Sequence, residues 1–253
     1  MVFQLSIRSP LRCLLAIMAA SWLAVVVQPT PASARTATIT ILCTADLHGC
    51  VHDTPGRYLE HNTGSLLRIA TLVKRIRAEN PNVLLLDTGD VFQGTAESLL
   101  SGGEAMSVPM NALGYDAIAV GNPEFDWGVA EAGRLLSLFD APVLAANLLR
   151  GPGAPAAFAR VKPWTVRTVD GVRVGIVGLT NPNLNQWFRD MAPVGLRAGD
   201  SRSALERCLP DLRRENPQVL ILLAHQSLQA KDDDANDNVA GAGEDGKQSL
   251  SAH

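Results

Sequence analysis

Four short apolar runs in this sequence are each followed closely by residues that bind metals in proteins. Those residues are Asp46 and His48, Asp87 and Asp90, Asn122, and His225. The runs have the composition of buried strands, and ligands in open α/β sheets gather at the carboxyl ends of the strands. We therefore expect these side chains to meet at one edge of a sheet. A mixture of carboxylate, imidazole and amide oxygen suits zinc, manganese or iron, whereas a set of oxygen ligands alone would suit magnesium or calcium.

Each of these signals also has an ordinary explanation when it is taken alone. Asp46 and His48 are two residues apart, so they point to the same side if the strand geometry continues that far. An Asp-x-His at the end of a strand can equally be a turn or a cap. Asn122 after a glycine is common in turns, and His225 can be a core histidine. The combination of all four in this order favours a shared metal site.

The pattern of apolar residues predicts the elements that carry these side chains. Alternation of strands with helices indicates an α/β fold with a largely parallel sheet. Thr63 or Ser65 can cap the first helix, and the runs 83–86 and 219–223 have the continuous apolar character of buried strands. We expect strands at 38–43, 83–86, 117–120, 143–146, 172–177 and 219–223, and helices at 65–78, 96–100, 106–113, 129–138 and 203–214.

The ordered motifs resemble those of calcineurin-like metallophosphoesterases. They are Asp46-x-His48, Gly89-Asp90-x-x-x-Gly94, Gly121-Asn122-x-Glu124 and His225. The segments 90–95 and 111–116, with Phe125-Asp126, look like the secreted 5′-nucleotidase branch of that group. The resemblance covers roughly residues 37–230.

This resemblance implies a fold and a chemistry. The fold is a sandwich of two mixed sheets flanked by helices, with the second sheet incomplete in this chain. Two divalent metal ions of the zinc, manganese or iron type are implied. Asp46, His48 and Asp90 would hold one ion, and Asp90, Asn122 and His225 the other, with Asp90 as the bridge. The implied reaction is hydrolysis of a phosphate ester, such as a nucleotide, by a metal-activated water.

The sequence departs from the family pattern at position 123. The family has Gly-Asn-His-Glu, whereas this chain has Gly121-Asn122-Pro123-Glu124. In the family, Asp126 would orient the histidine that assists the leaving group, and Pro123 has no proton to give. Loss of a general acid costs roughly 10²–10⁴-fold in rate. Pro123 also favours an extended backbone at Asn122, which would displace that ligand.

A second departure lies beyond His225. The family supplies one further histidine to each metal from a Gly-His-x-His motif, and this sequence contains no such motif. We therefore expect low metal occupancy and a weakened or inactive hydrolase. The alternative is a non-catalytic phosphate- or nucleotide-binding protein derived from the same fold. An unrelated nucleotide-binding domain built on Gly175 and Gly178 is disfavoured, because these glycines do not match the dinucleotide fingerprint.

The two ends of the chain differ in composition from the part between them. Residues 1–34 have basic residues, an apolar run and Ala32-Ser33-Ala34, which predicts a secretory signal peptide cleaved after Ala34. An uncleaved membrane anchor is the alternative. The phosphoesterase domain is then 35–228, and 229–253 forms an acidic, disordered tail. A frameshift, a premature stop, a wrong gene model or evolution to a short form would each produce that tail.

Export sets the expected compartment and partners. We expect a periplasmic or extracellular protein without stable membrane association after cleavage. The net charge of −3 argues against a nucleic-acid partner and leaves a small phosphate ester or nucleotide. Three cysteines remain after cleavage, so Cys43 and Cys50 could pair, or could stay as a buried thiol and a loop thiol beside Cys208.

Overall fold

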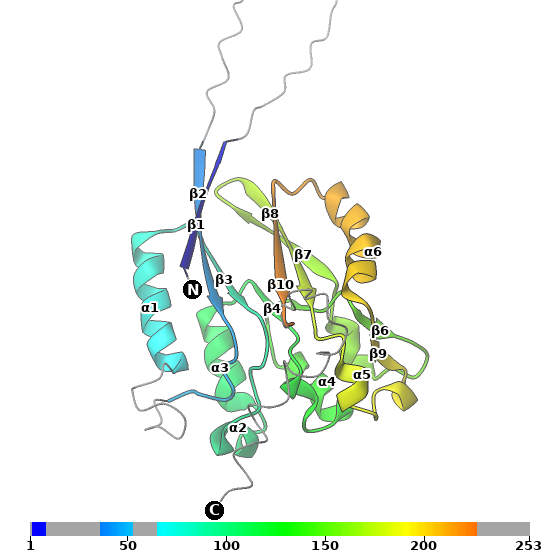
Figure 1. The fold of residues 1–253 in the computed structure, drawn as a ribbon. Coiled ribbons are helices and arrows are strands. Elements are labelled where there is room, and N and C mark those ends of the chain that lie inside the picture. The colour runs from blue at the N-terminus through cyan, green and yellow to red at the C-terminus, as the bar shows by residue number, and fades with distance from the viewer. Residues whose placement is uncertain (1, 9–35, 53–64, 227–253) are drawn as a thin grey trace, which may run out of the picture.

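The computed structural model describes residues 2–8, 36–52 and 65–226. The expected acidic tail, most of the expected signal peptide and Thr63 lie outside these residues. Within them, an α/β architecture with two principal sheets is present, and the predicted fold class is confirmed (Figure 1).

The first sheet has five strands in the order β1-β2-β3-β4-β5. Strands β2 to β5 pair in parallel, as the sequence predicts, and β1 pairs antiparallel with β2. Parallel pairing places the carboxyl ends of β2, β3 and β4 at one edge, directly before three of the predicted ligand segments. The strands are β1 (Val2–Arg8), β2 (Thr36–Thr44), β3 (Val83–Asp87), β4 (Ala117–Ala119) and β5 (Val143–Leu144).

The second sheet has the order β10-β8-β7, where β10 and β8 are parallel and β8 and β7 antiparallel. Strands β6 and β9 form a separate two-stranded antiparallel sheet. Strands β6, β7 and β9 were not predicted from the sequence, and neither was β1, whose residues were assigned to the signal peptide. Their bounds, with those of the predicted strands, are β6 (Leu148–Arg150), β7 (Trp164–Val169), β8 (Val172–Leu179), β9 (Leu196–Ala198) and β10 (Val219–Ala224).

An apolar layer fills the space between the two sheets. The first sheet contributes Ile39, Leu84 and Leu86 among others, and the second contributes Ile176 and Leu223. Leu85 points the opposite way, into the cluster beneath the helices. Strand β3 is therefore buried on both faces, as its continuous apolar run predicts.

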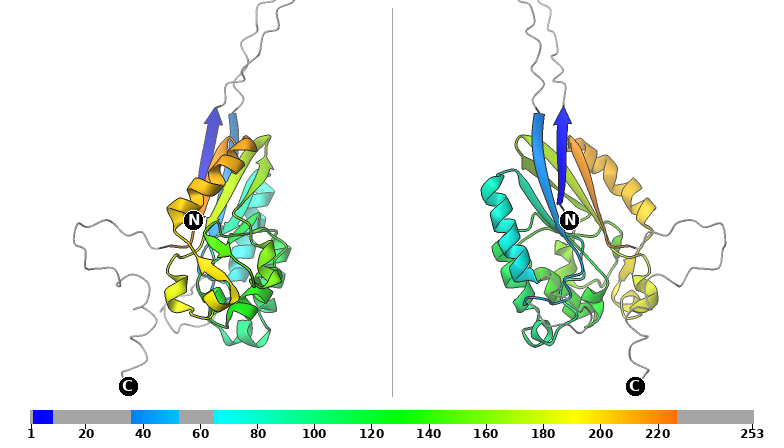
Figure 2. Two further views of the ribbon diagram at one scale, coloured as in Figure 1. Left: turned by 90° about the vertical axis from the view of Figure 1, so that its right-hand side faces the viewer. Right: turned by 60° about the vertical axis from the view of Figure 1, so that its left-hand side comes forward.

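Helices cover the outer faces of the sandwich, with α1 and α6 on opposite sides (Figures 1 and 2). Ser65 caps α1 and Asp200 caps α6, each accepting a hydrogen bond from a backbone N–H of the first turn. The helices are α1 (Leu66–Glu79), α2 (Ala96–Leu100), α3 (Glu104–Leu113), α4 (Val129–Ser137), α5 (Leu184–Trp187) and α6 (Ser201–Arg214). Short 3₁₀ helices are η1 (Pro123–Phe125), η2 (Ala156–Arg160) and η3 (Ala192–Val194).

Strand β10 differs from the sequence prediction of a buried strand. It forms the edge of its three-stranded sheet, and Leu220 and Leu222 are 48% and 49% exposed. Only Leu223, on the other face, is fully in the core at 3% exposure. The apolar run was correct as a strand signal, but it did not reveal that helix α6 leaves one face of this edge strand uncovered.

The amino-terminal residues form strand β1. Val2–Arg8 pairs with residues 36–42 of β2, so removal of residues 1–34 would leave β2 at the edge of the sheet. Within the described ranges, no helix has the length and apolar character needed to cross a membrane. The described residues also contain no disulfide, and Cys50 Sγ instead lies 3.9 Å from the carbonyl oxygen of His48.

Candidate metal centre

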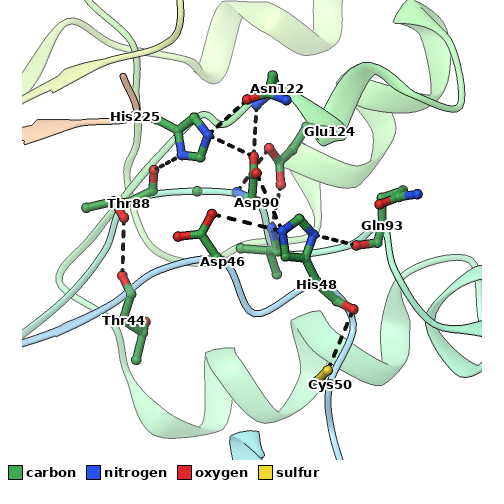
Figure 3. Close-up of polar contacts among 12 residues, drawn as sticks. Thr44, Asp46, His48, Cys50, Thr88, Asp90, Gln93, Asn122, Glu124 and His225 are labelled. Carbon is green, nitrogen blue, oxygen red and sulfur yellow. Dashed lines mark hydrogen bonds and ion pairs between the residues drawn. The ribbon is translucent and has the colours of Figure 1, made fainter. Parts of the chain in front are cut away.

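Asp90 lies at the centre of the candidate site, with its two carboxylate oxygens facing different neighbours (Figure 3). Its Oδ2 is 3.7 Å from Nε2 of His48, and its Oδ1 is 3.2 Å from Nε2 of His225. Oδ1 also accepts a 2.9 Å hydrogen bond from the backbone N–H of Asn122. The side chain is 7% exposed, so this carboxylate is largely withdrawn from water while it faces both histidines.

The Asp46–His48 turn supplies the outer part of the site. Strand β2 ends at Thr44, and Asp46 and His48 have φ angles of 53° and 46°. The assumption that strand geometry continues to His48 is therefore wrong. Both side chains nevertheless reach the site, because the turn is held against the β3 loop by backbone hydrogen bonds from Asp46 to Gly89 and from His48 to Asp90.

Both histidines are held so that Nε2 faces the other candidate ligands. His48 Nδ1 is 2.9 Å from the carbonyl oxygen of Gln93, and His225 Nδ1 is 3.1 Å from that of Thr88. A carbonyl oxygen only accepts, so each Nδ1 must carry the proton and donate. This leaves Nε2 available as a ligand atom, and metal-binding histidines usually donate from their other ring nitrogen in this way.

The donor set of the first cluster fits a divalent ion. Ligand atoms of Asp46, His48 and Asp90 all lie within 4.8 Å of one another, the spacing expected around an ion with bonds of about 2 Å. His48 Nε2 lies 3.9 Å from Asp46 Oδ1, so there is room between them for an ion. We therefore regard Asp46, His48 and Asp90 as a possible metal-binding group.

The side chains of the second cluster lie closer together than those of the first, and His225 faces the carboxylate of Asp90. His225 Nε2 is 3.0 Å from Oδ1 of Asn122, in addition to its contact with Asp90. Burial opposes the charged imidazole, but the hydrogen bond to Asp90 and the nearby carboxylates outweigh it and raise the pKa of His225 to about 9. A proton on Nε2 thus occupies the position that a cation would take, so a metal ion would displace it.

Glu124 fixes the backbone of the β3 loop from beneath. Its Oε1 accepts from the N–H of Val91 at 2.6 Å and its Oε2 from that of Asp90 at 3.3 Å. Burial, with the charge of Asp90, raises the pKa of Glu124 to about 7. Asp90 has a left-handed φ of 62°, and these bonds hold that uncommon conformation in place.

Comparison with known proteins identifies the family of this chain. The sequence pattern of the calcineurin-like phosphoesterase family matches residues 39–248. The chain belongs to the calcineurin-like phosphoesterase family. The 5′-nucleotidase of Rattus norvegicus is 36% identical over 212 residues, which cover 78% of this chain and 35% of the relative. That of Diplobatis ommata is 40% identical over 152 residues, covering 56% and 26%.

Solved structures give the same family and a similar partial coverage. The 5′-nucleotidase precursor of Thermus thermophilus is 28% identical with a TM-score of 0.67, over 74% of this chain and 37% of that one. The calcineurin-like phosphoesterase YfkN of Bacillus subtilis is 28% identical with a TM-score of 0.61, over 76% and 63%. This phosphoesterase chain therefore spans about a third of the length of the curated 5′-nucleotidases it matches.

Pro123 does not disturb Asn122 in the way the sequence predicted. Asn122 has φ −95° and ψ −40°, a helical and not an extended conformation, and Pro123 begins the 3₁₀ helix η1. Proline is well placed at the start of a helix because its missing N–H has no helical partner there. The expected displacement of Asn122 is wrong, and its oxygen remains beside His225.

Asp126 lies at the end of η1 with no hydrogen bond to its carboxylate from the described residues, and its residue surface is exposed. Although Asp126 is exposed at the surface, the protein atoms around its carboxyl group partly desolvate it, and this desolvation, with the charge of Asp90, raises its pKa above the ordinary value. Sequence reasoning named Glu124 only as part of a motif and passed over Asn147 and Asn181, although all three shape the site. The two asparagines follow β5 and β8, so the strand-end argument applied to Asp46 and Asn122 could have found them.

Proposed function

We propose that this phosphoesterase holds two divalent metal ions and binds the phosphate group of a nucleotide or related phosphate ester, with strongly reduced hydrolysis. Asp46, His48 and Asp90 would hold one ion, and Asp90, Asn122 and His225 the other. The observation that supports this most directly is the division of the Asp90 oxygens between His48 and His225. The names of the 5′-nucleotidase relatives support a nucleotide as the substrate class.

The proposed chemistry follows from what each side chain can do. Bound divalent ions of the zinc, manganese or iron type would polarise the phosphate and lower the pKa of a water. Asp90 and the two histidines would orient those ions, and Thr88 and Gln93 fix the rings through their carbonyl oxygens. The missing part is proton donation to the leaving group, because Pro123 carries no proton where the family has histidine.

The test separates binding from turnover. The purified chain would be titrated with Mn²⁺ and assayed for hydrolysis of adenosine monophosphate and p-nitrophenyl phosphate, together with Asp90→Asn and Pro123→His. We expect Asp90→Asn to lose Mn²⁺ binding. We expect Pro123→His to raise hydrolysis by roughly 10²-fold or more, because a general acid contributes about 10²–10⁴-fold. Rapid hydrolysis by the unmodified chain would contradict the proposed loss of turnover.

The second candidate function is a non-catalytic phosphate- or nucleotide-binding protein. One feature favours it, namely Pro123 at the position where the family has histidine. Its distinguishing result is nucleotide binding by the unmodified chain with no hydrolysis in Pro123→His either.

We also propose that the protein is exported to the periplasm or the extracellular space, with cleavage after Ala34. The basic residues, apolar run and Ala32-Ser33-Ala34 of residues 1–34 support this. Amino-terminal sequencing of the exported protein should begin at Arg35. A mature protein that still carries residues 2–8 would contradict the proposal.

A further inference from the structure

Asn181 stands two residues beyond the end of β8 and lines the pocket at the candidate metal centre. It is 6% exposed. The pocket has a volume of about 250 Å³. Besides Asn181 and Ala224, its lining consists of Asp46, Thr88, Asn122, His225 and Gln226. Asn181 thus shares one small, polar cavity with three of the proposed ligands but is not itself a predicted ligand.

The orientation of the Asn181 amide follows from its one hydrogen bond. Its Oδ1 accepts from the backbone N–H of Asn183 at 2.9 Å. Its Nδ2 therefore points away from that turn and makes no hydrogen bond within the described part of the chain. Among the described residues, Ser98 Oγ is the only side-chain polar atom that is fully enclosed and lacks a partner. Asn181 Nδ2 also lacks a protein partner, so it is not fully enclosed. It therefore faces the pocket that Asn181 lines, where it offers two N–H donors.

The backbone beside Asn181 is held by a dense set of hydrogen bonds. Asn147, which is fully buried, accepts from the N–H of Thr180 at 2.9 Å and donates to its carbonyl oxygen at 2.8 Å. Gln226 donates to the same oxygen at 2.9 Å and to Ser201 Oγ at 2.6 Å. A donor placed on so rigid a support loses little freedom when it binds a ligand.

The remaining chemistry of the pocket defines what such a donor would bind. Asp46, Asn122 and His225 would direct their ligand atoms to metal ions, and no lysine or arginine lines this pocket among the described residues. A phosphate group has more oxygens than two ions can contact. An oxygen turned away from the ions needs a hydrogen-bond donor, because a carboxylate there would repel it, and the Asn181 amide can supply that donor.

We propose that Asn181 is a phosphate-binding residue that donates from Nδ2 to a non-bridging oxygen of the substrate. This inference rests on the proposed function and adds to it a residue outside the predicted ligand set. The amide fixes the rotation of the phosphate group about the metal centre, while Oδ1 remains bonded to Asn183.

Asn181→Asp is the most informative substitution. An aspartate keeps an oxygen for the N–H of Asn183 but replaces the donor with a negatively charged acceptor. Asn185→Asp is the matched control, since Asn185 is four residues away, outside the pocket, and binds Ala198 through both side-chain atoms. It introduces the same charge into the same segment, and it loses its donor bond to Ala198 instead.

Binding of inorganic phosphate to the Mn²⁺-loaded full chain would be measured by calorimetry, and Mn²⁺ affinity by electron paramagnetic resonance. We expect Asn181→Asp to weaken phosphate binding at least about 10-fold and Asn181→Ala about 3- to 10-fold. Mn²⁺ should bind both variants no more weakly than it binds the unmodified chain. Asn185→Asp should bind phosphate as the unmodified chain does.

The outcomes distinguish this inference from the proposed function. Equal phosphate affinity in the unmodified chain and Asn181→Asp, with Mn²⁺ bound to both, would overturn the role of Asn181 alone. An equal loss in Asn185→Asp would also overturn it, because a general charge effect would then explain the result. If the unmodified chain binds no Mn²⁺, both the proposed function and this inference are wrong.

Discussion

Asp87 carries a buried carboxyl group whose ionisation should set much of the pH dependence of folding. It is the last residue of β3 and is fully buried. Its carboxylate accepts from Thr44 Oγ1 at 2.5 Å and from the N–H of Gly89 at 2.8 Å. Burial outweighs these two hydrogen bonds and raises its pKa from 3.8 to about 7.

The sign of the effect follows from which state binds the proton more tightly. Below pH 3.8 Asp87 is protonated in both the folded and the unfolded chain, and it costs no stability. Between pH 3.8 and 7 the unfolded chain releases the proton but the folded chain keeps it, so stability falls as pH rises. A difference of about 3 pKa units corresponds to about 4 kcal/mol, which is fully lost above pH 7.

Asp87→Asn should remove this penalty. The amide oxygen can still accept from Gly89, and the amide nitrogen can donate to Thr44 Oγ1. We expect the variant to unfold like the unmodified chain near pH 4 and to be more stable by up to about 4 kcal/mol at pH 8. Urea unfolding of the metal-free chains at pH 4, 5, 6, 7 and 8 measures this difference.

Glu124 and His225 are present in both Asp87→Asn and the unmodified chain. Their titrations therefore cancel when the unfolding free energy of one chain is subtracted from that of the other. Asp140→Asn serves as the control, because Asp140 is an exposed carboxylate on the surface, and it should give no gain that grows with pH. A difference between Asp87→Asn and the unmodified chain that stays constant from pH 4 to pH 8 would refute the reasoning.

Two further predictions concern packing at the site and at the edge of the second sheet. A Cβ at Gly121 would lie 2.0 Å from Asp90 Oδ1, so Gly121→Ala should abolish Mn²⁺ binding, whereas Gly151→Ala, with no atom nearer than 3.5 Å, should retain it in the same titration. Leu223→Ala should cost about 2–5 kcal/mol in urea unfolding and Leu222→Ala less than about 1 kcal/mol, since their exposures are 3% and 49%; equal losses would show that β10 is covered on both faces.

The residue types at the strand ends were the part of the site that the sequence could predict. Buried strands have recognisable apolar runs, and the residues that follow β2, β3 and β4 lie at one edge of the first sheet. The expectation of a single sheet edge was wrong for His225, because it follows β10 of the second sheet. That argument found Asp46, Asp90, Asn122 and His225, and the structure brings all four together. It needed only the order of the elements, which local composition largely determines.

The conformations that aim these side chains could not be predicted in the same way. Asp46, His48 and Asp90 all have positive φ angles, which the tertiary hydrogen bonds between two loops maintain. The backbone preferences of the residues themselves do not predict such angles, because positive φ angles are uncommon for residues other than glycine. The same limit explains Asn122, where the general effect of a following proline was overridden by the start of η1.

Strands β6, β7 and β9 were missed for a different reason. Their pairing partners supply their stability, and their own sequences have no long apolar run. Strand β7 is intermediate or exposed along its whole length, so its side chains do not show the composition of a buried strand. Asn147 and Asn181 were missed because an asparagine after a strand is common in turns, and neither has an acidic residue or a histidine within three residues in the sequence.

The structure separates the residues that would hold metal from the residue that would complete the reaction. Asp90 keeps its place through Glu124 and through the N–H of Asn122, and neither contact involves the side chain at position 123. Replacement of the family histidine by Pro123 can therefore remove proton donation without displacing the candidate ligands. A loss of turnover would therefore not require a loss of metal or phosphate binding, which is why the two must be measured independently.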